Sequence, residues 1–596
     1  MSDQFRIVTD PAGDSLALSA LFAVLPLLTL FILLGVLRMR AWLAGIIALV
    51  VALVIAVAVY AMPVGQALLS ASEGAAFGFF PILWIVINAI WVYNLTVASG
   101  HFDVLRRSMA RLSPDMRIQG VIVAFCFGAL LEALAGFGTP VAVTVVMLMA
   151  LGFPPLRAAS VALIANTAPV AFGALATPIV TLGTVTSGAV DDPRLNPDTL
   201  GAMVGRQTPL LAVVVPLVLV LVIDGRRGVR QTWPAAAVAG VVFAVAQFVA
   251  SNYISVPLTD IIAALLSAAA VVLLLRVWRP VESPDLRADE AQVPATAGDG
   301  SAGAGVRSGE GEGEGGARAG GTPGPVAAGA GVLGGGAGGD RLGRRDSGAE
   351  VARAYAPYLI IIAIFSVANI GAVKAALAEP PWTVTFAWPG LDIVGANGKS
   401  LASTTFTLGW LGAAGTLMIL AGILTALVLR IRPGRALRAY LDTYVELRHA
   451  IVTVMAVLAL AYVLNQSGQT NTLGEFLAQA GGVFIFLSAI LGWIGVAVTG
   501  SDTSSNALFG ALQVETAVRA GLDPVLLAAA NSSGGVLGKM ISPQNLAIAA
   551  SAVGMAGREG DIFRKVVGWS LVLLAVMCVL VTLQSTPVLS WMVPGE

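Results

Sequence analysis

The sequence predicts an all-α polytopic membrane protein, and three observations support this fold class. Of the 596 residues, 57% are hydrophobic and only 11% are charged, whereas soluble domains carry about 25% charged residues. Apolar stretches of roughly 20 residues, the length that crosses a bilayer, recur along almost the whole chain. Clusters of Gly, Pro, Ser, Thr and Asn interrupt these stretches at two places, one in each half. We therefore expect two inverted repeats with about 12 transmembrane helices, two re-entrant hairpins and two broken helices.

The apolar stretches give the expected elements in chain order. Single spans are predicted at roughly 16–37, 42–62, 74–98, 199–223, 233–252, 258–277, 355–377, 406–430, 449–465 and 566–588. The hairpins and broken helices fall in the two interrupted regions, 119–190 and 480–557.

A Gly/Ala-rich stretch separates the two halves of the chain. Its runs of Gly and Glu cannot bury enough apolar surface to fold. We divide the chain into a first repeat, two connecting helices, a disordered cytoplasmic linker and a second repeat. Their ranges are 1–223, 224–279, 280–352 and 353–596.

The two interrupted regions share their spacing. Gly136 precedes Asn166 by 30 residues and Gly500 precedes Asn531 by 31, and a proline follows each of these asparagines by 12 residues. A single interruption is most simply a kink or a site of small-residue helix packing. Paired interruptions in two halves instead indicate the midplane binding site of a transporter, because broken helices persist in a bilayer only where protein or a water-filled cavity lines them.

The distribution of Lys and Arg predicts the sidedness, since positive loops stay in the cytoplasm. The first interrupted region begins inside at Arg117 and ends outside at Asp192, whereas the second begins outside at Glu475 and ends inside at Arg558. The halves are therefore expected to be inverted relative to each other.

Each interrupted region must then cross the membrane an odd number of times. Residues 140–151 would form only about 18 Å of helix, which is short of a ~30 Å hydrocarbon core. We expect hairpins with tips at 136–140 and 500–506, followed by broken helices through 155–190 and 524–557.

Half-helices that end near the bilayer centre attract anions, because their first N–H groups are unpaired and the helix dipole is positive there. Hydroxyl and amide side chains at these ends can donate to a carboxylate and to a neighbouring hydroxyl, which suits a small, polar, singly charged ligand. The candidate substrate-binding residues are Gly138, Thr139, Asn166, Thr167, Ser504, Ser505, Asn506, Asn531, Ser532, Ser533 and Lys539.

Ionisable residues within membrane segments are functional candidates because they are costly to bury. Lys539 is placed to meet a substrate carboxylate, and Asp502 or Glu132 to carry a proton, with Asp502 the first choice. The structural alternative is that Lys539 pairs with Asp502 or extends its ammonium to the interface. Asp260 is a weaker candidate, expected near an interface.

Other function classes lack the residues that they need. The net charge of +0 gives no indication of a nucleic-acid partner, and the two cysteines and two histidines form no metal or catalytic cluster in the sequence. We expect no enzyme activity, cofactor or metal. A transporter of a larger, multiply charged anion would need more than one intramembrane cation. A Gly-rich segment near 395–400 lacks the spacing of a phosphate-binding loop, because position 393 is Ile.

Taken together, these motifs resemble those of the lactate permease family of bacterial secondary transporters. The segments that carry the resemblance are 81–85, 132–142, 166–173, 388–391, 499–506 and 532–546. The resemblance implies proton symport of L-lactate, and often D-lactate or glycolate, across the cytoplasmic membrane. It also implies kinship with the ion transporter superfamily, whose members place paired hairpin tips at the site and usually form homodimers. Sodium coupling is the alternative, because broken-helix carbonyls and hydroxyls hold sodium in other inverted-repeat transporters.

Overall fold

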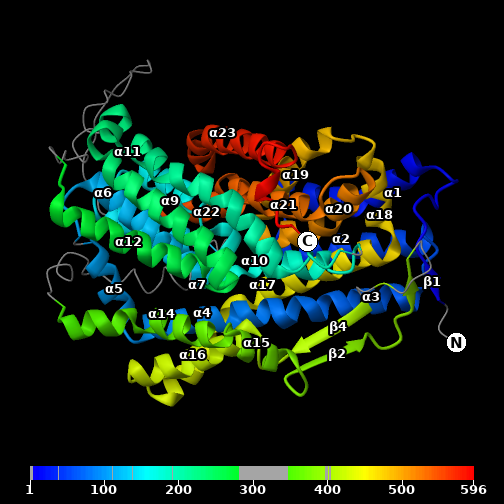
Figure 1. The fold of residues 1–596 in the computed structure, drawn as a ribbon, viewed down its shortest axis with the longest axis horizontal. Helices are drawn as coiled ribbons and strands as arrows, with labels where there is room; N and C mark the ends of the chain where they lie inside the picture. Colours follow the sequence, from blue (N-terminus) through cyan, green and yellow to red (C-terminus); the bar gives the residue numbers. More distant parts are fainter. Residues whose placement is uncertain are drawn as a thin grey trace, which may run out of the picture.

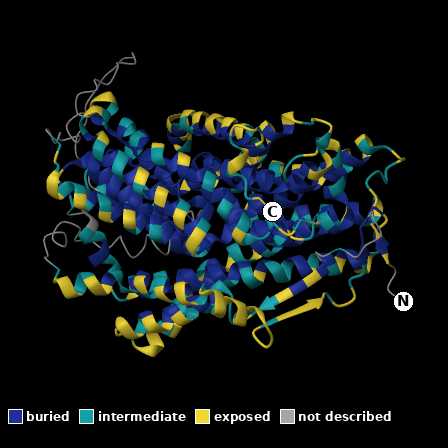
Figure 2. Ribbon diagram, in the orientation of Figure 1, coloured by how far each residue is buried: buried dark blue, intermediate teal, exposed yellow. Residues whose placement is uncertain are grey.

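The structure confirms a helical, multi-pass membrane protein. It is a computed structural model that describes residues 4–37, 39–110, 112–136, 138–190, 192–280, 346–395, 401 and 404–595. Within these residues nine helices are long and apolar enough to cross a membrane, and one bent helix pair makes a tenth span. The helices pack side by side along the long axis (Figure 1). Buried residues fill the interior and exposed ones lie on the outer faces (Figure 2).

Three predicted spans precede the first interrupted region, and each is found as a helix. The elements are α1 (Leu16–Phe31) with η1 (Ile32–Val36), α2 (Ala41–Ala58), α3 (Val64–Phe77), η2 (Gly78–Leu83), α4 (Trp84–Ala98) and α5 (His101–Ala110). The backbone unwinds within η2 at Phe80 (φ −130°, ψ 121°), next to Pro81, which has no N–H to donate to a helix.

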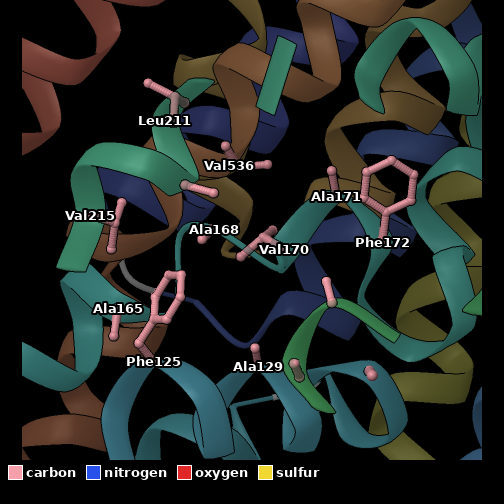
Figure 3. Packing of buried hydrophobic residues seen from close by; sticks show 14 of the residues in the cluster. Phe125, Ala129, Ala165, Ala168, Val170, Ala171, Phe172, Leu211, Val215 and Val536 are labelled. Atoms are coloured by element: carbon pink, nitrogen blue, oxygen red, sulfur yellow. The ribbon is translucent and has the colours of Figure 1, made fainter. Parts of the chain in front are cut away.

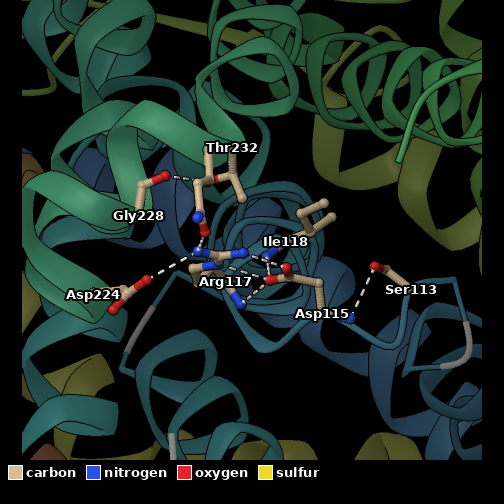
Figure 4. A network of polar contacts seen from close by, with 8 residues as sticks. Ser113, Asp115, Arg117, Ile118, Asp224, Gly228 and Thr232 are labelled. Atoms are coloured by element: carbon tan, nitrogen blue, oxygen red, sulfur yellow. Dashed lines mark hydrogen bonds and ion pairs between the residues drawn. The ribbon is translucent and has the colours of Figure 1, made fainter. Parts of the chain in front are cut away.

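Element α11 (Pro197–Val249) contains the two spans predicted at 199–223 and 233–252, and a kink with non-helical backbone at Asp224 and Gly225 separates them. It packs against α12 (Thr259–Val277). Near the kink, Arg117 was predicted in a cytoplasmic loop but is fully buried. Its guanidinium binds Asp115 at 2.7 Å and Asp224 at 2.9 Å, and these two carboxylates compensate its charge (Figure 4).

The second half begins earlier than predicted. Helix α14 (Gly348–Ala368) starts inside the predicted linker, because Ser347 and Glu350 form a capping box at its N-terminus. Most of that linker, 281–345, lies outside the described residues. The remaining scaffold helices are α15 (Gly371–Ala378), α16 (Ala414–Val428), α17 (Pro433–Ser467), α18 (Gln469–Ala478) and α23 (Glu559–Gln584).

The predicted span 406–430 is wrong at its start. Strand β4 (Thr405–Gly409) pairs antiparallel with β2 (Thr383–Ala387), and the helix begins only at Ala414. Alternating Thr and Phe favour an extended strand here. A second short pairing joins β1 (Phe5–Arg6) to β3 (Ile393–Val394) in parallel. These strands are small additions to a helical fold.

The two halves of the chain are packed into one body. Helix α17 lies against α2 and α3, and α16 lies against α4 (Figure 1). Between the loops, Arg194 binds Asp192 at 2.8 Å and Asp523 at 3.0 Å. The hydrogen bond from Arg194 lowers the pKa of the Asp192 carboxyl. These loops follow the first broken helix and the second hairpin, and both are predicted to lie outside the cell.

Candidate functional site

The first interrupted region forms a helical hairpin. Its first arm comprises α6 (Met116–Gly120), η3 (Val121–Phe127) and α7 (Gly128–Ala135), and its second arm is α8 (Thr139–Ala150). The chain reverses at Gly138, whose φ of +84° is left-handed. This backbone conformation favours glycine, and a Cβ there would also lie 2.4 Å from Ile548 Cδ1, the end of a side chain that would have to move. The turn lies within the predicted tip, 136–140.

A broken helix follows, as predicted. Helix α9 (Pro155–Ala165) ends before η4 (Val170–Phe172) and α10 (Gly173–Thr186), with a bend of 64°. Apolar side chains surround the break, and Val536 from the second half is among them (Figure 3). Protein therefore encloses the interrupted backbone, which is the condition for a break within a bilayer.

The second interrupted region repeats this order of elements. The hairpin consists of α19 (Val483–Thr499) and α20 (Asp502–Arg519), and it turns at Gly500 with φ +74°. Helix α21 (Pro524–Gly538), η8 (Lys539–Ile541) and α22 (Pro543–Ala552) form the second broken helix. The two regions interlock, because α22 packs against α8 and α20 packs against α10.

An ion pair joins the two regions. Lys539 Nζ lies 2.5 Å from Glu132 Oε1 and donates to the carbonyl of Gly136 at 3.2 Å. Asn166 Nδ2 donates to the other oxygen of Glu132 at 2.8 Å. Both charged side chains are almost fully buried. Desolvating such a pair costs several kcal/mol per ion, which close contact and these additional hydrogen bonds offset.

The partner of Lys539 is therefore Glu132, and the predicted structural alternative, a pair with Asp502, is wrong. Lys539 is still close enough to act electrostatically on Asp502 and on Asp260. The buried ammonium of Lys539 therefore interacts with three buried carboxyl groups, those of Glu132, Asp502 and Asp260.

The second cluster is centred on Asp502. Its Oδ2 accepts a hydrogen bond from Ser532 Oγ at 2.6 Å and a long one from Asn506 Nδ2 at 3.5 Å. Asn531 Nδ2 donates to Asn506 Oδ1 at 2.9 Å, and Asn506 Nδ2 also reaches the carbonyl of Pro178 at 3.1 Å. These hydrogen bonds connect the second hairpin to the second broken helix and to α10, which belongs to the first broken helix.

Three buried polar atoms of the candidate site residues have no hydrogen-bond partner within the described part of the chain. They are Asp502 Oδ1, Asn166 Oδ1 and Ser533 Oγ. More than 90% of buried polar groups in proteins are paired, so each exception requires an explanation. Unsatisfied acceptors and hydroxyls beside a buried ion pair provide hydrogen-bonding positions for a polar ligand, a proton or water.

Other predicted site residues lie close by in different roles. The Ser505 hydroxyl donates to Gly492 O at 3.1 Å, and the Thr167 hydroxyl donates to Ile164 O at 2.7 Å. The hydroxyl protons of Ser505 and Thr167 are therefore already donated to backbone carbonyl groups. Thr139 is half-buried at the start of α8, and Ser504 is buried in the first turn of α20.

Sequence reasoning missed several polar partners. Gln513 Nε2 donates to Asn531 Oδ1 at 3.2 Å, and its position two turns after Asn506 on α20 would have placed it on the same helix face. Asp260, a weaker candidate from the sequence, is only 1% exposed. It accepts a hydrogen bond from Gln247, whose amide also reaches the carbonyl of Ala168 in the first break, both at 3.2 Å.

Comparison with known proteins identifies the family. The family model described as "L-lactate permease" matches residues 19–588. The L-lactate permease of Bacillus subtilis (strain 168) is 40% identical over 603 residues, which cover 98% of this chain and 99% of that protein. The glycolate permease GlcA of Escherichia coli (strain K12) is 40% identical over 585 residues, covering 96% and 97%.

Among solved structures, the YdaH transporter of Alcanivorax borkumensis aligns with 86% of each chain at a TM-score of 0.42 and 15% identity. The family match and the identity to the two permeases extend over nearly the whole chain. The chain therefore belongs to the L-lactate permease family, whose members are transporters and not enzymes.

Proposed function

We propose that the protein imports L-lactate, together with D-lactate or glycolate, by symport with protons across the cytoplasmic membrane. The observation that carries the proposal is the buried pair of Lys539 and Glu132 between the two interrupted regions. The substrate class follows from the relatives, which are named for L-lactate and for glycolate. Both are small 2-hydroxy monocarboxylates. A homodimeric assembly belongs to the same proposal.

Lys539 is the cation that meets the substrate carboxylate. Among the described residues, the buried basic side chains are Lys539 and Arg117, and Arg117 is held between Asp115 and Asp224. The unpaired Asn166 Oδ1 is an acceptor for the neighbouring substrate hydroxyl, because its amide nitrogen already donates to Glu132. A single cation matches a singly charged substrate.

Lys539 exchanges Glu132 for the substrate carboxylate, and this exchange couples substrate binding to proton binding. When the substrate carboxylate binds Lys539, Glu132 loses its ammonium partner and becomes an uncompensated buried charge. A proton on Glu132 removes that charge. In the empty site the charges of Lys539 and Glu132 cancel. In the loaded site the charges of Lys539 and the substrate carboxylate cancel, and Glu132 is neutral because it holds the proton. Loading either one alone leaves a net charge, so carboxylate and proton move together in a ratio of one to one.

The direct contact between Glu132 and Lys539 favours Glu132 over Asp502 as the proton carrier, which is the opposite of the order expected from the sequence. Asp502 is held by Ser532 in the second cluster and is a supporting carboxyl group. The alternative function, sodium-coupled transport of another small anion, draws on the same unpaired oxygen atoms, since sodium binds oxygen at broken helices.

Counterflow in proteoliposomes tests the substrate class. Vesicles loaded with unlabelled L-lactate should accumulate labelled L-lactate transiently, and internal D-lactate or glycolate should substitute for it. Pyruvate probes the hydroxyl contact, because it keeps the carboxylate and replaces the hydroxyl with a carbonyl that cannot donate to Asn166. Exchange of dicarboxylates in place of these acids would contradict the proposal.

A further inference from the structure

Two hollows lie on the same pair of helices, away from the candidate site. The first has a volume of about 570 Å³ and lies where the part of α11 after the kink meets the C-terminal end of α12. Its lining is cationic and aromatic: Arg227, Arg230, Gln231, Trp233, Trp278 and Arg279.

Two arginines of this pocket carry charge that no acid among the described residues compensates. Arg230 and Arg279 are exposed and have no ion-pair partner among the described residues. The neighbouring carboxylate, Asp224, is already bound by Arg117 at 2.9 Å. Trp233 and Trp278 flank these arginines, and tryptophan is typical of the membrane–water interface. The pocket therefore favours an anion at the level of lipid head groups.

The second hollow is an apolar groove of about 320 Å³ on α11 and α12. Aliphatic side chains line it, among them Val241, Val245, Val249, Ile262 and Leu266. On α11 the residues Val241, Val245 and Val249 recur every four positions, which places them on one helix face. Exposed residues lie along the outer face of this helix pair (Figure 2).

The two hollows have the spacing of a lipid's head and tail. Trp233 in the first and Val245 in the second are 12 residues apart on α11, which is about 18 Å along a helix. One leaflet contributes about 15 Å of hydrocarbon. A groove that merely contacted bulk lipid would need no cationic pocket at its end, and a pocket for free phosphate would need no apolar extension.

We propose that α11 and α12 bind a phospholipid with an anionic head group, with its phosphate among Arg230, Arg279 and the two tryptophans and one acyl chain along the groove. The predicted sidedness puts this pocket at the cytoplasmic leaflet, whose anionic lipids attract basic residues at the membrane surface. The site is independent of the proposed transport mechanism.

Native mass spectrometry of the detergent-solubilised full-length protein tests the proposal. The probes are phosphatidylglycerol, phosphatidylethanolamine with the same acyl chains, and inorganic phosphate. Wild type should retain phosphatidylglycerol, and the variant Arg230→Gln/Arg279→Gln should bind it about thirtyfold more weakly. The control Arg432→Gln/Arg438→Gln removes two exposed arginines elsewhere and should bind like wild type.

A groove variant tests the acyl chain separately. Val245→Trp fills the apolar groove while leaving the arginines in place, and it should weaken phosphatidylglycerol binding without changing phosphate binding. This variant also tests the lipid site if the arginine variant fails to fold. Equal retention of phosphatidylglycerol by the variants and wild type would overturn the proposal. So would equal binding of the two lipids, or full competition by inorganic phosphate.

Discussion

Replacement of Lys539 by methionine probes the central ion pair. The change keeps most of the side-chain volume but removes the ammonium that contacts Glu132 at 2.5 Å and Gly136 O at 3.2 Å. The Glu132 side chain, only 2% exposed, then becomes an unpaired buried charge. Removal of one partner of such a pair costs about 3–5 kcal/mol. We expect the lower end, because Asn166 still donates to Glu132 at 2.8 Å.

The double variant Glu132→Gln/Lys539→Met separates stability from function. Replacing both members of a buried pair by neutral groups often leaves stability unchanged. The free energy of unfolding of the double variant should therefore lie within about 1 kcal/mol of the wild-type value. Substrate binding should stay at least about 30-fold weaker in both variants, since each lacks the cation for the substrate carboxylate.

Thermal unfolding of purified protein, with and without L-lactate, and uptake into proteoliposomes measure the two effects. Wild type should be stabilised by L-lactate, and neither variant should respond to it. If the double variant regains uptake as well as stability, the pair is only structural. If Lys539→Met alone is as stable and as active as wild type, the description of the buried charge is wrong.

Three further predictions concern the second cluster and the topology. Gly535→Ala should reduce uptake at least tenfold, because its Cβ would lie 2.4 Å from a carboxylate oxygen of the second hairpin, whereas Gly568→Ala meets no atom within 4 Å and should transport normally. Asn531→Ala should abolish most uptake without reducing expression, since it removes a donor at the hairpin contact; wild-type uptake would make that contact structural. A cysteine near Asp192 should label from outside and one near Gly560 only from inside, and labelling of both from one side would contradict inverted repeats.

The order of elements within each interrupted region could be predicted from the sequence. Gly138 and Gly500 occupy left-handed turns that favour glycine, and the second arm of each hairpin begins just after them, at Thr139 and Asp502. Length alone misled the prediction of one span, because strand β4 replaced its start. The spans predicted at 199–223 and 233–252 correspond to the two segments of α11 on either side of Asp224 and Gly225.

The contacts of the candidate site could not be predicted in the same way. Glu132 and Lys539 are separated by 407 positions, and their pairing depends on how the two interrupted regions dock. The sequence offered Asp502 only as a structural alternative partner of Lys539 and did not indicate Glu132. Gln247 and Asp260 lie in apolar helices outside both regions, so no motif linked them to the first break.

Uptake of labelled L-lactate into sodium-free proteoliposomes tests proton symport most directly. With acid outside and the membrane potential clamped, wild type should accumulate L-lactate until the imposed pH gradient decays, and a protonophore should abolish accumulation. Glu132→Gln should lose gradient-driven accumulation, whereas Asp502→Asn tests the other carboxyl group under the same conditions. Accumulation that requires sodium and ignores the pH gradient would contradict proton coupling, and gradient-driven accumulation by Glu132→Gln would exclude Glu132 as the proton carrier.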